Sequence, residues 1–296
     1  MSLNTPSTAK TTRSTKPVCN RIAIVFDFDD TLAPDTFDAL IESLELDVET
    51  FRQERYQPLL DAGWDSTLAR GYALLQESQR RQPNQRITRD YLVQLGKQFQ
   101  PFDGLEEMFD RLHQIVRDLN PKIDLEFYVI SGGIEEIACH TSIAHNFKRI
   151  WGCQFHYDDR GEIDFLKRVI SHTEKARYLM QIASGQESVE GNGRSFAYRD
   201  MPEDQLHVPL SQMIYVGDGA SDVPCFSVIN DEGGISLGVY KDAQTWDDEI
   251  QVSESQRVAN LAEADYRADS ELMRSLTLAL ESLCKQITLR QLSLDE

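Results

Sequence analysis

The sequence predicts a three-layer, Rossmann-like α/β fold with an inserted all-helical domain. Short, mostly apolar runs occur at residues 22–26, 125–130 and 212–216, and the first is unbroken and rich in β-branched residues. Such runs are typical of strands that are buried on both faces, as in a parallel sheet. Amphipathic helical patterns lie between these runs, and an alternation of strands with helices favours a parallel sheet covered on both sides.

Length, charge and cysteine usage narrow the class of protein. The 296 residues are enough for one large domain or for a core with an insert. A net charge of −19 disfavours a general nucleic-acid binder and means that a phosphorylated ligand needs local positive charge. No apolar run approaches the roughly 20 residues of a membrane helix, so we expect no membrane association. The five cysteines form no CxxC pair, which indicates reduced thiols and a cytoplasmic protein.

The inserted domain is expected between residues 34 and 100. Residues 1–19 are rich in Ser, Thr and Lys, which predicts a disordered tail and not a secretory signal. Four helical patterns then follow without a strand, near residues 37–44, 47–61, 68–80 and 88–99. Asp47 is a plausible N-cap of the second helix, and Gly63 is suited to end it.

The remaining chain, residues 20–33 and 101–296, is assigned to the core domain. An apolar stripe predicts a helix over residues 105–119, and the strand at 125–130 is followed by Ser131, Gly132 and Gly133. The further expected elements are a helix near 134–147, a hairpin over 154–165, a helix over 173–183, strands near 234–239 and 264–266, and a closing helix over 272–287. The polar segment 184–207 is interpreted as a flexible insertion.

Three of the predicted strands end in polar residues that can carry chemistry. Asp27 and Asp29 follow the first strand on one side of the chain, and Ser131 follows the second. Asp218 and Asp222 follow the third. Ligands of open α/β sheets bind beyond the carboxyl ends of the strands, so we expect these side chains to converge. Clustered carboxylates are costly to bury without a positive partner, and an oxygen-rich set suits Mg²⁺.

The same segments resemble the motifs of the haloacid dehalogenase superfamily. Asp-Phe-Asp-Asp-Thr at 27–31 resembles the first motif, DxDxT, and Tyr-Val-Ile-Ser-Gly-Gly at 128–133 resembles the second. Lys175 is similar to the lysine of the third motif, and Gly-Asp-Gly-Ala-Ser-Asp at 217–222 resembles the fourth. The resemblance covers about residues 21–32 and 102–240 and implies that the helical insert is a cap domain. The motifs are most similar to those of phosphoserine-phosphatase-like members.

The resemblance implies a role for each matching residue. Asp27 would be the nucleophile that forms an aspartyl-phosphate, and Asp29 would be the general acid and base. Ser131 and the Gly132 amide would hold phosphoryl oxygens, and Lys175 would neutralise their charge. The metal set implied for Mg²⁺ comprises Asp27, the main-chain carbonyl of Asp29, Asp218 and, directly or through water, Asp222.

Simpler interpretations of these residues remain open at this point. Ser131 and Asp222 could each be only the cap of the helix that follows. Lys148 and Lys167 compete with Lys175 for the third-motif role, and only the place of Lys175 before the third strand favours it.

The function also has alternatives. Asp29 favours a phosphatase acting on a small phosphorylated metabolite, but a phosphomutase or phosphotransferase of the same superfamily would carry similar motifs. A non-catalytic binding relative that uses the cap as a partner surface is the third possibility. The sequence leaves the substrate and the oligomeric state open, and it does not show which of the cap arginines face the pocket.

Overall fold

A seven-stranded sheet forms the centre of the protein. The computed structural model describes residues 18–185, 201–202, 205–241 and 258–293. The strand order is β4-β3-β2-β1-β5-β6-β7, and every pairing is parallel except that of β3 with β4. The strands are β1 Arg21–Phe26, β2 Asp124–Ile134, β3 Arg149–Tyr157, β4 Ile163–Arg168, β5 Met213–Gly217, β6 Ile235–Tyr240 and β7 Asn260–Glu263. The predicted α/β class is therefore confirmed.

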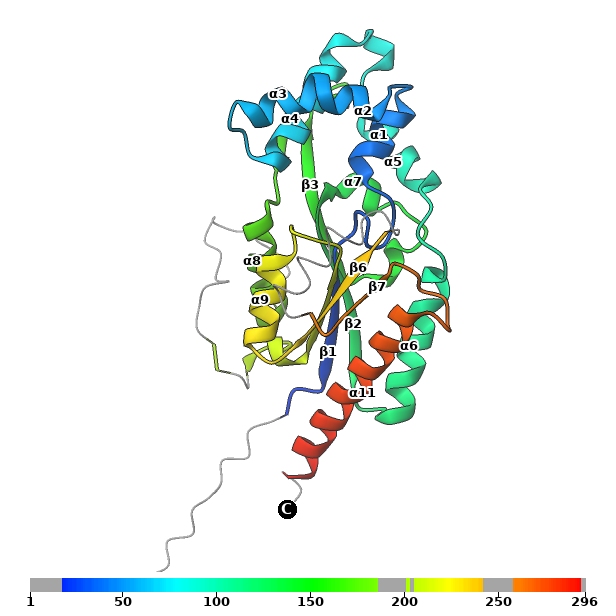
Figure 1. Cartoon of the computed structure of the whole chain (residues 1–296), viewed down its shortest axis with the longest axis vertical. Coiled ribbons are helices and arrows are strands. Elements are labelled where there is room, and N and C mark those ends of the chain that lie inside the picture. Colours follow the sequence, from blue (N-terminus) through cyan, green and yellow to red (C-terminus); the bar gives the residue numbers. More distant parts are fainter. Residues whose placement is uncertain (1–17, 186–200, 203–204, 242–257, 294–296) are drawn as a thin grey trace, which may run out of the picture.

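Helices cover both faces of this sheet (Figure 1). The side chains of Ile22, Ile24 and Phe26 pack with the helices of one face, and those of Ala23 and Val25 pack with the helices of the other. The first face carries α6 and α11, and the second carries α8 and α9. Their bounds are α6 Leu105–Leu119, α8 His172–Ser184, α9 Val223–Asp231 and α11 Glu271–Leu292. The alternation that buries both faces of β1 is thus the physical origin of the three layers.

The order of the strands places a topological switch beside β1. The chain fills one side of β1 with β2, β3 and β4, and then crosses to β5 on the other side. Loops that leave neighbouring strands in opposite directions open a crevice at the carboxyl edge of a sheet. The residues that follow β1 and β5 therefore line the most favourable position for a ligand in this fold.

Four helical stretches fill the region between β1 and α6. They comprise α1 Thr36–Ser43, the continuous run of α2 Val48–Phe51, η1 Arg52–Tyr56 and α3 Gln57–Asp61, then α4 Ser66–Arg80, η2 Pro83–Gln85, and α5 Arg89–Gln98. The four predicted helices are confirmed, and the Asp47 side chain accepts the Thr50 N–H at 2.8 Å as the predicted cap. The η1 turn is π-helical. Pro58 cannot donate the N–H that an α-helical bond to residue 54 requires, which accounts for the wider turn.

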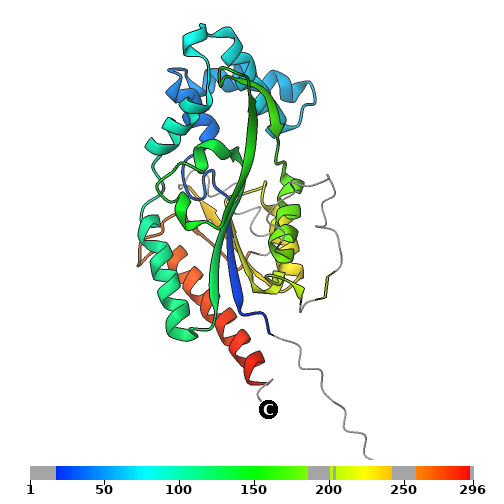
Figure 2. The same cartoon turned by 180° about the vertical axis from the view of Figure 1, so that it is seen from behind.

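The helical region rests on the β3–β4 hairpin, whose strands run on from the core sheet (Figures 1 and 2). The Ile163 amide donates to the Ile87 carbonyl at 3.0 Å, and the Arg89 amide donates to the Gly161 carbonyl at 2.8 Å. Gly71 of α4 lies directly against Leu166 of β4. The hairpin was predicted near residues 154–165, but its role as a support for the helices was not.

The sequence prediction for the segment after β2 is wrong. A helix was expected over residues 134–147, but β2 continues to Ile134 and is followed only by α7 Glu135–Ala138 and the 3₁₀ turn η3 Ala144–Asn146. Thr141 donates its hydroxyl to the Ala138 carbonyl at 2.9 Å, a local bond by which a Thr side chain competes with continued helix. The first half of β3, residues 149–153, was not predicted, because its apolar residues do not alternate with polar ones.

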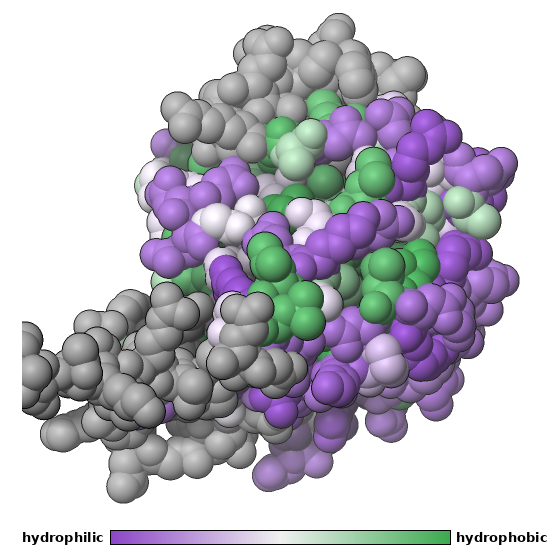
Figure 3. Space-filling view, turned by 90° about the horizontal axis from the view of Figure 1, so that it is seen from below, coloured by the Kyte–Doolittle hydropathy of each residue, from purple (hydrophilic) through white to green (hydrophobic). Residues whose placement is uncertain are grey.

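Smaller differences occur near the ends of the chain. The strand expected at residues 264–266 forms earlier, as β7. The predicted tail and the predicted insertion fall largely on residues outside the described ranges, so both stay predictions. Among the described residues, no helix combines the length and apolar character needed to cross a membrane. The face seen from the lower end of Figure 1 mixes hydrophilic areas with separate hydrophobic ones (Figure 3).

Candidate active site

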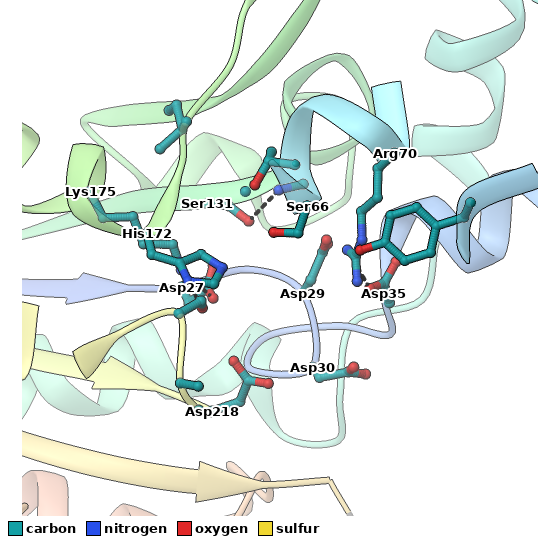
Figure 4. Close-up of a pocket in the computed structure, with 18 residues that line it drawn as sticks. Asp27, Asp29, Asp30, Asp35, Ser66, Arg70, Ser131, His172, Lys175 and Asp218 are labelled. Carbon is teal, nitrogen blue, oxygen red and sulfur yellow. Dashed lines mark hydrogen bonds and ion pairs between the residues drawn. The ribbon is translucent and has the colours of Figure 1, made fainter. Parts of the chain in front are cut away.

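The side chain of Lys175 reaches Asp27 at the carboxyl edge of the sheet (Figure 4). It sits in the first turn of α8, and its side chain is only 2% exposed. Its ammonium donates to Asp27 Oδ2 at 2.6 Å and to Asp222 Oδ1 at 2.8 Å. Burial disfavours the charged lysine, but these two carboxylates hold the pKa of Lys175 above its ordinary value. A fixed positive charge therefore lies between Asp27, which follows β1, and Asp222, which precedes α9.

The structure separates Lys175 from its two rivals. Lys148 forms an ion pair with Glu126 at 2.8 Å. Lys167 lies on β4 and does not line the cavity that contains Asp27. Of the three lysines, only Lys175 reaches the strand-end acids.

Three acids could hold a cation at this position. Carboxylate oxygens of Asp27, Asp218 and Asp222 all lie within 4.8 Å of one another. Burial raises the pKa of Asp27 to about 6, with Lys175 opposing and Asp222 reinforcing the shift. Burial, Asp222 and Asp27 likewise raise the pKa of Asp218 well above its ordinary value. One lysine thus does not offset the three acids, and a set of hard oxygen ligands with excess negative charge fits Mg²⁺.

Asp222 is held by contacts that have nothing to do with helix capping. It is completely buried, and the Tyr215 hydroxyl donates to its Oδ1 at 2.6 Å. Its side chain caps none of the first amides of α9, although it stands at the N-cap position. Its carboxylate is instead directed at Lys175 and the strand-end cluster, so the simple capping interpretation does not hold.

Asp29 is held apart from the three-acid cluster. Its carboxylate accepts the amide and the hydroxyl of Thr36, each at 3.1 Å, and the Thr36 hydroxyl in turn accepts the Ile134 amide at 3.0 Å. Burial, followed by the charges of Asp35 and Asp27, raises the pKa of Asp29 well above its ordinary value. A raised pKa favours the protonated form, so Asp29 keeps its proton to a higher pH than an ordinary aspartate.

Ser131 and Gly132 form the wall opposite Asp218. Ser131 is 2% exposed, lines the cavity, and accepts the Gly133 amide at 3.0 Å. It cannot cap α7, because that helix begins at Glu135 with Ile134 at its N-cap. Gly133 brings the backbone against Asp29, since a β-carbon there would lie 2.5 Å from a carboxylate oxygen.

This contact makes a matched pair of substitutions informative. We expect Gly133→Ala to displace the Asp29 carboxylate and to reduce kcat by roughly 10²-fold, because the proton donor that the motif resemblance implies at Asp29 would lose its alignment. Gly132→Ala is the control, since its β-carbon would meet only the Ile170 carbonyl at an ordinary 3.6 Å. Steady-state kinetics with any phosphate ester that the wild-type protein hydrolyses would measure both. Equal losses of kcat in the two variants would contradict the interpretation that Gly133 holds Asp29 in position.

The helical region closes the cavity, which has a volume of about 230 Å³. The lining residues from this region are Asp35, Tyr56, Ser66, Thr67 and Arg70. Arg70 donates to Asp35 Oδ2 at 2.9 Å, and its guanidinium lies 5.3 Å from the centre of the Phe37 ring. The charges of Asp35 and Asp29 hold the pKa of Arg70 above its ordinary value against the effect of burial. The wall opposite Asp27 therefore presents one carboxylate and one guanidinium.

Several of these residues were missed in the sequence. Asp35 precedes a helix and accepts the Phe37 amide at 2.8 Å, so it is indistinguishable from an ordinary cap. Arg70 is one of several arginines in the helical region, and no spacing distinguishes it. His172 and Ser221 also line the cavity, and neither belongs to a recognisable pattern.

The chain is similar to several known proteins. A protein from Borreliella burgdorferi, described only as uncharacterized, is 25% identical over 218 residues, which are 66% of this chain and 71% of that protein. A structure of a HAD family hydrolase from Salmonella enterica serovar Typhi has a TM-score of 0.56 at 13% identity and covers 89% of this chain and 72% of that one. A substrate-bound phosphoserine phosphatase also has a TM-score of 0.56, at 14% identity, covering 87% and 98%.

The two structural likenesses show a shared fold. The family model of the haloacid dehalogenase-like hydrolases matches residues 24–227, which span β1, the helical region and the strand-end residues as far as α9. The chain belongs to the haloacid dehalogenase-like hydrolase family.

Proposed function

We propose that this protein is a Mg²⁺-dependent phosphatase that hydrolyses a small phosphate monoester through an aspartyl-phosphate on Asp27. The observation that carries the proposal is the position of Asp27, which is buried at the end of β1 with Lys175 at 2.6 Å and two further acids close by. A buried carboxylate beside fixed positive charge is a suitable nucleophile for phosphorus, because the approaching phosphoryl group is itself negative.

The free state of all five cysteines supports a cytoplasmic location.

In the first step, an Asp27 oxygen bonds to phosphorus and the bond from phosphorus to the ester oxygen breaks. The leaving alkoxide takes a proton from Asp29, whose raised pKa keeps that proton available. Asp29 is then a carboxylate and takes a proton from water as the water oxygen attacks phosphorus. The bond to Asp27 breaks, inorganic phosphate leaves, and both aspartates return to their starting states.

The remaining residues hold charge and position. Asp27, Asp218 and Asp222 would bind Mg²⁺, which would supply positive charge to the phosphoryl oxygens when bound. Lys175 would supply a second, fixed positive charge, and the Ser131 hydroxyl and Gly132 amide, which line the same cavity, would hold phosphoryl oxygens. Local positive charge is needed because a net charge of −19 repels an anionic substrate at long range.

The cap-side wall favours an organic group that carries both signs of charge. Arg70 can bind a carboxylate and Asp35 can bind an ammonium, and the two lie side by side opposite Asp27. The small cavity suits a leaving group of amino-acid size. Phosphoserine has this chemistry, and solved structures of phosphoserine phosphatases share the fold. We therefore propose phosphoserine as the first substrate to test among small phosphorylated metabolites.

This substrate assignment predicts a selective effect at Arg70. We expect Arg70→Met to raise KM for phosphoserine by about 10²-fold, as follows from the loss of one charge-assisted contact to a carboxylate. KM for a phosphate ester without a carboxylate should change by only a few-fold. The comparison of the two substrates on the same variant is the measurement, and an equal rise for both would exclude Arg70 as the carboxylate partner.

The metal assignment predicts that Asp218→Asn raises Tm in EDTA but reduces the increase in Tm that Mg²⁺ produces. Asp218→Asn removes one charge from the repelling cluster, so in EDTA we expect Tm to rise by a few degrees, corresponding to about 1 kcal/mol. The same variant should lose most of the Tm increase that Mg²⁺ gives to the wild-type protein. Thermal unfolding of both proteins with Mg²⁺ and with EDTA measures this. An unchanged response of the variant to Mg²⁺ would remove Asp218 from the metal site.

A phosphomutase or phosphotransferase remains the second candidate, since the strand-end residues would serve either reaction. Release of inorganic phosphate from phosphoserine or an aryl phosphate, dependent on Mg²⁺ and abolished by chelator, tests the proposal directly. Phosphoryl transfer to a second hydroxyl without release would favour the mutase. A non-catalytic relative gains no support from the site, in which all four acids and Lys175 are present.

A further inference from the structure

A second cavity lies on the edge of β3, away from the strand-end acids. It has a volume of about 830 Å³, which falls in the usual range of small-molecule sites and exceeds the first cavity severalfold. Neither Asp27 nor any other of the strand-end acids lines it. Its wall is formed by α7, the chain that leads from there into β3, and the end of β4.

The lining of this cavity is basic, although the chain as a whole is strongly acidic. Among the residues that the structure describes, four cationic side chains and one carboxylate line it, namely Lys148, Arg149, Lys167 and Arg168 with Glu135. We call this cavity the basic groove. His140 and His145 also line the groove, and among the described residues no further acid does. Since acids outnumber bases by 49 to 30 in the chain, such an excess of positive charge is a local feature.

The one carboxylate in the groove is already committed to the protein. Glu135 accepts the Gly152 amide at 2.8 Å and also bonds Gln154 and Arg168. Arg168 donates in addition to the Gly152 carbonyl at 3.0 Å. On one edge of β3, β4 pairs only from Gln154 onward. The side chains of Glu135 and Arg168 cover the part of this edge before Gln154, which pairs with no described strand.

The cations of the groove are spread along this edge. Lys148 also pairs with Glu126, outside the lining, whereas Lys167 is exposed and pairs with no described residue. Arg168 bonds to Gly152, three residues after Arg149 in β3. Three residues of a strand span about 10 Å, so the two pairs of basic residues are about this far apart. Two basic pairs at this separation match a ligand with at least two separate anionic groups. Arg and Lys bind phosphate and carboxylate groups through charge-assisted hydrogen bonds.

We propose that the basic groove is a second binding site, distinct from the cavity at Asp27, for a small polyanion that carries two or more phosphate or carboxylate groups. Residues 148–149 would bind one anionic group and residues 167–168 would bind another. The proposal does not depend on the phosphatase assignment, because none of these side chains lines the first cavity.

Inositol hexakisphosphate is a suitable probe, since it is a compact polyanion too bulky for a cavity of about 230 Å³. Isothermal titration in EDTA at near-physiological salt should show one site on the wild-type protein. Arg149→Glu combined with Lys167→Glu should weaken binding by about 100-fold, as expected when two charge-assisted contacts are lost. Both positions are exposed, so the fold should persist, and thermal unfolding would verify that it does.

The control is a double variant with the same change in net charge near the opposite edge of the sheet. Arg274→Glu combined with Lys285→Glu alters two exposed residues of α11, the helix that packs beside β7. We expect this variant to bind the probe within a factor of about three of wild type. Equal weakening in both double variants, or no binding to the wild-type protein, would overturn the proposal.

Discussion

Lys175→Met should destabilise the protein by about 3–5 kcal/mol at neutral pH, the range measured when one partner of a buried ion pair is removed. The ammonium of Lys175 is the shared partner of Asp27 and Asp222, both of which are buried. Without it, two carboxylates remain in a region of low polarity with no compensating charge. The same loss should remove turnover, because the fixed charge beside the nucleophile disappears.

The loss of stability should depend on pH in a defined direction. The pKa of Asp27 is raised to about 6 even with Lys175 present, and Lys175 is the main factor that lowers it. In the variant this pKa must rise further above the unfolded value of about 3.9. A group with a raised pKa in the folded state stabilises that state at low pH and loses the contribution as the pH passes its folded pKa. The stability deficit should therefore be large at pH 7.5 and smaller at pH 5.

Urea unfolding of wild type and variant in EDTA at both pH values measures this dependence. Lys97→Met, which changes an exposed lysine of α5, controls for the loss of a charge and should alter stability by at most about 0.5 kcal/mol. A deficit that is equal at pH 5 and pH 7.5 would show that the carboxylates around Lys175 are not the source of the destabilisation.

Asp27→Asn should abolish turnover, by about 10⁴-fold or more, while leaving the protein folded. An amide cannot attack phosphorus, yet its oxygen can still accept the Phe28 amide that now bonds Asp27 Oδ1 at 2.7 Å. The substitution also removes one of several repelling charges, so the free energy of unfolding should stay near that of the wild-type protein. Phosphate release and urea unfolding measure the two effects separately.

Asp30→Asn is the matched control for Asp27→Asn. Asp30 lies in the same turn and lines the same cavity, but its partner is Lys241 at 3.0 Å. We expect this variant to keep activity within a few-fold of wild type. Substantial turnover by Asp27→Asn would exclude Asp27 as the nucleophile and with it the proposed aspartyl-phosphate.

The sequence was most informative where the signal is local. The strand at residues 22–26 and the acids after it are adjacent in the chain, and the side-chain alternation of a strand fixes which of them share a side. Lys175 needed one further assumption, its place before the third strand, and the structure brings it to Asp27 and Asp222. The failed helix at residues 134–147 shows the limit of this reasoning, because an apolar pattern does not reveal a competing Thr141 bond.

Other features depend on contacts between distant parts of the chain. Arg70 reaches the cavity because α4 packs on β4, about 95 residues later, where Gly71 lets Leu166 approach. The basic groove likewise joins residues 148–149 to residues 167–168 only after β3 and β4 have paired.

The sequence by itself determined the α/β class, the strand-end acids and the four motifs. Each of these features depends on residues that are neighbours in the chain, and the periodicity of apolar residues indicates the local backbone structure. The tertiary structure alone decided which residues of the helical region face Asp27, how Asp29 is held, and where positive charge gathers on an acidic chain. These depend on packing between elements, and the side chains that meet there carry no common pattern along the sequence.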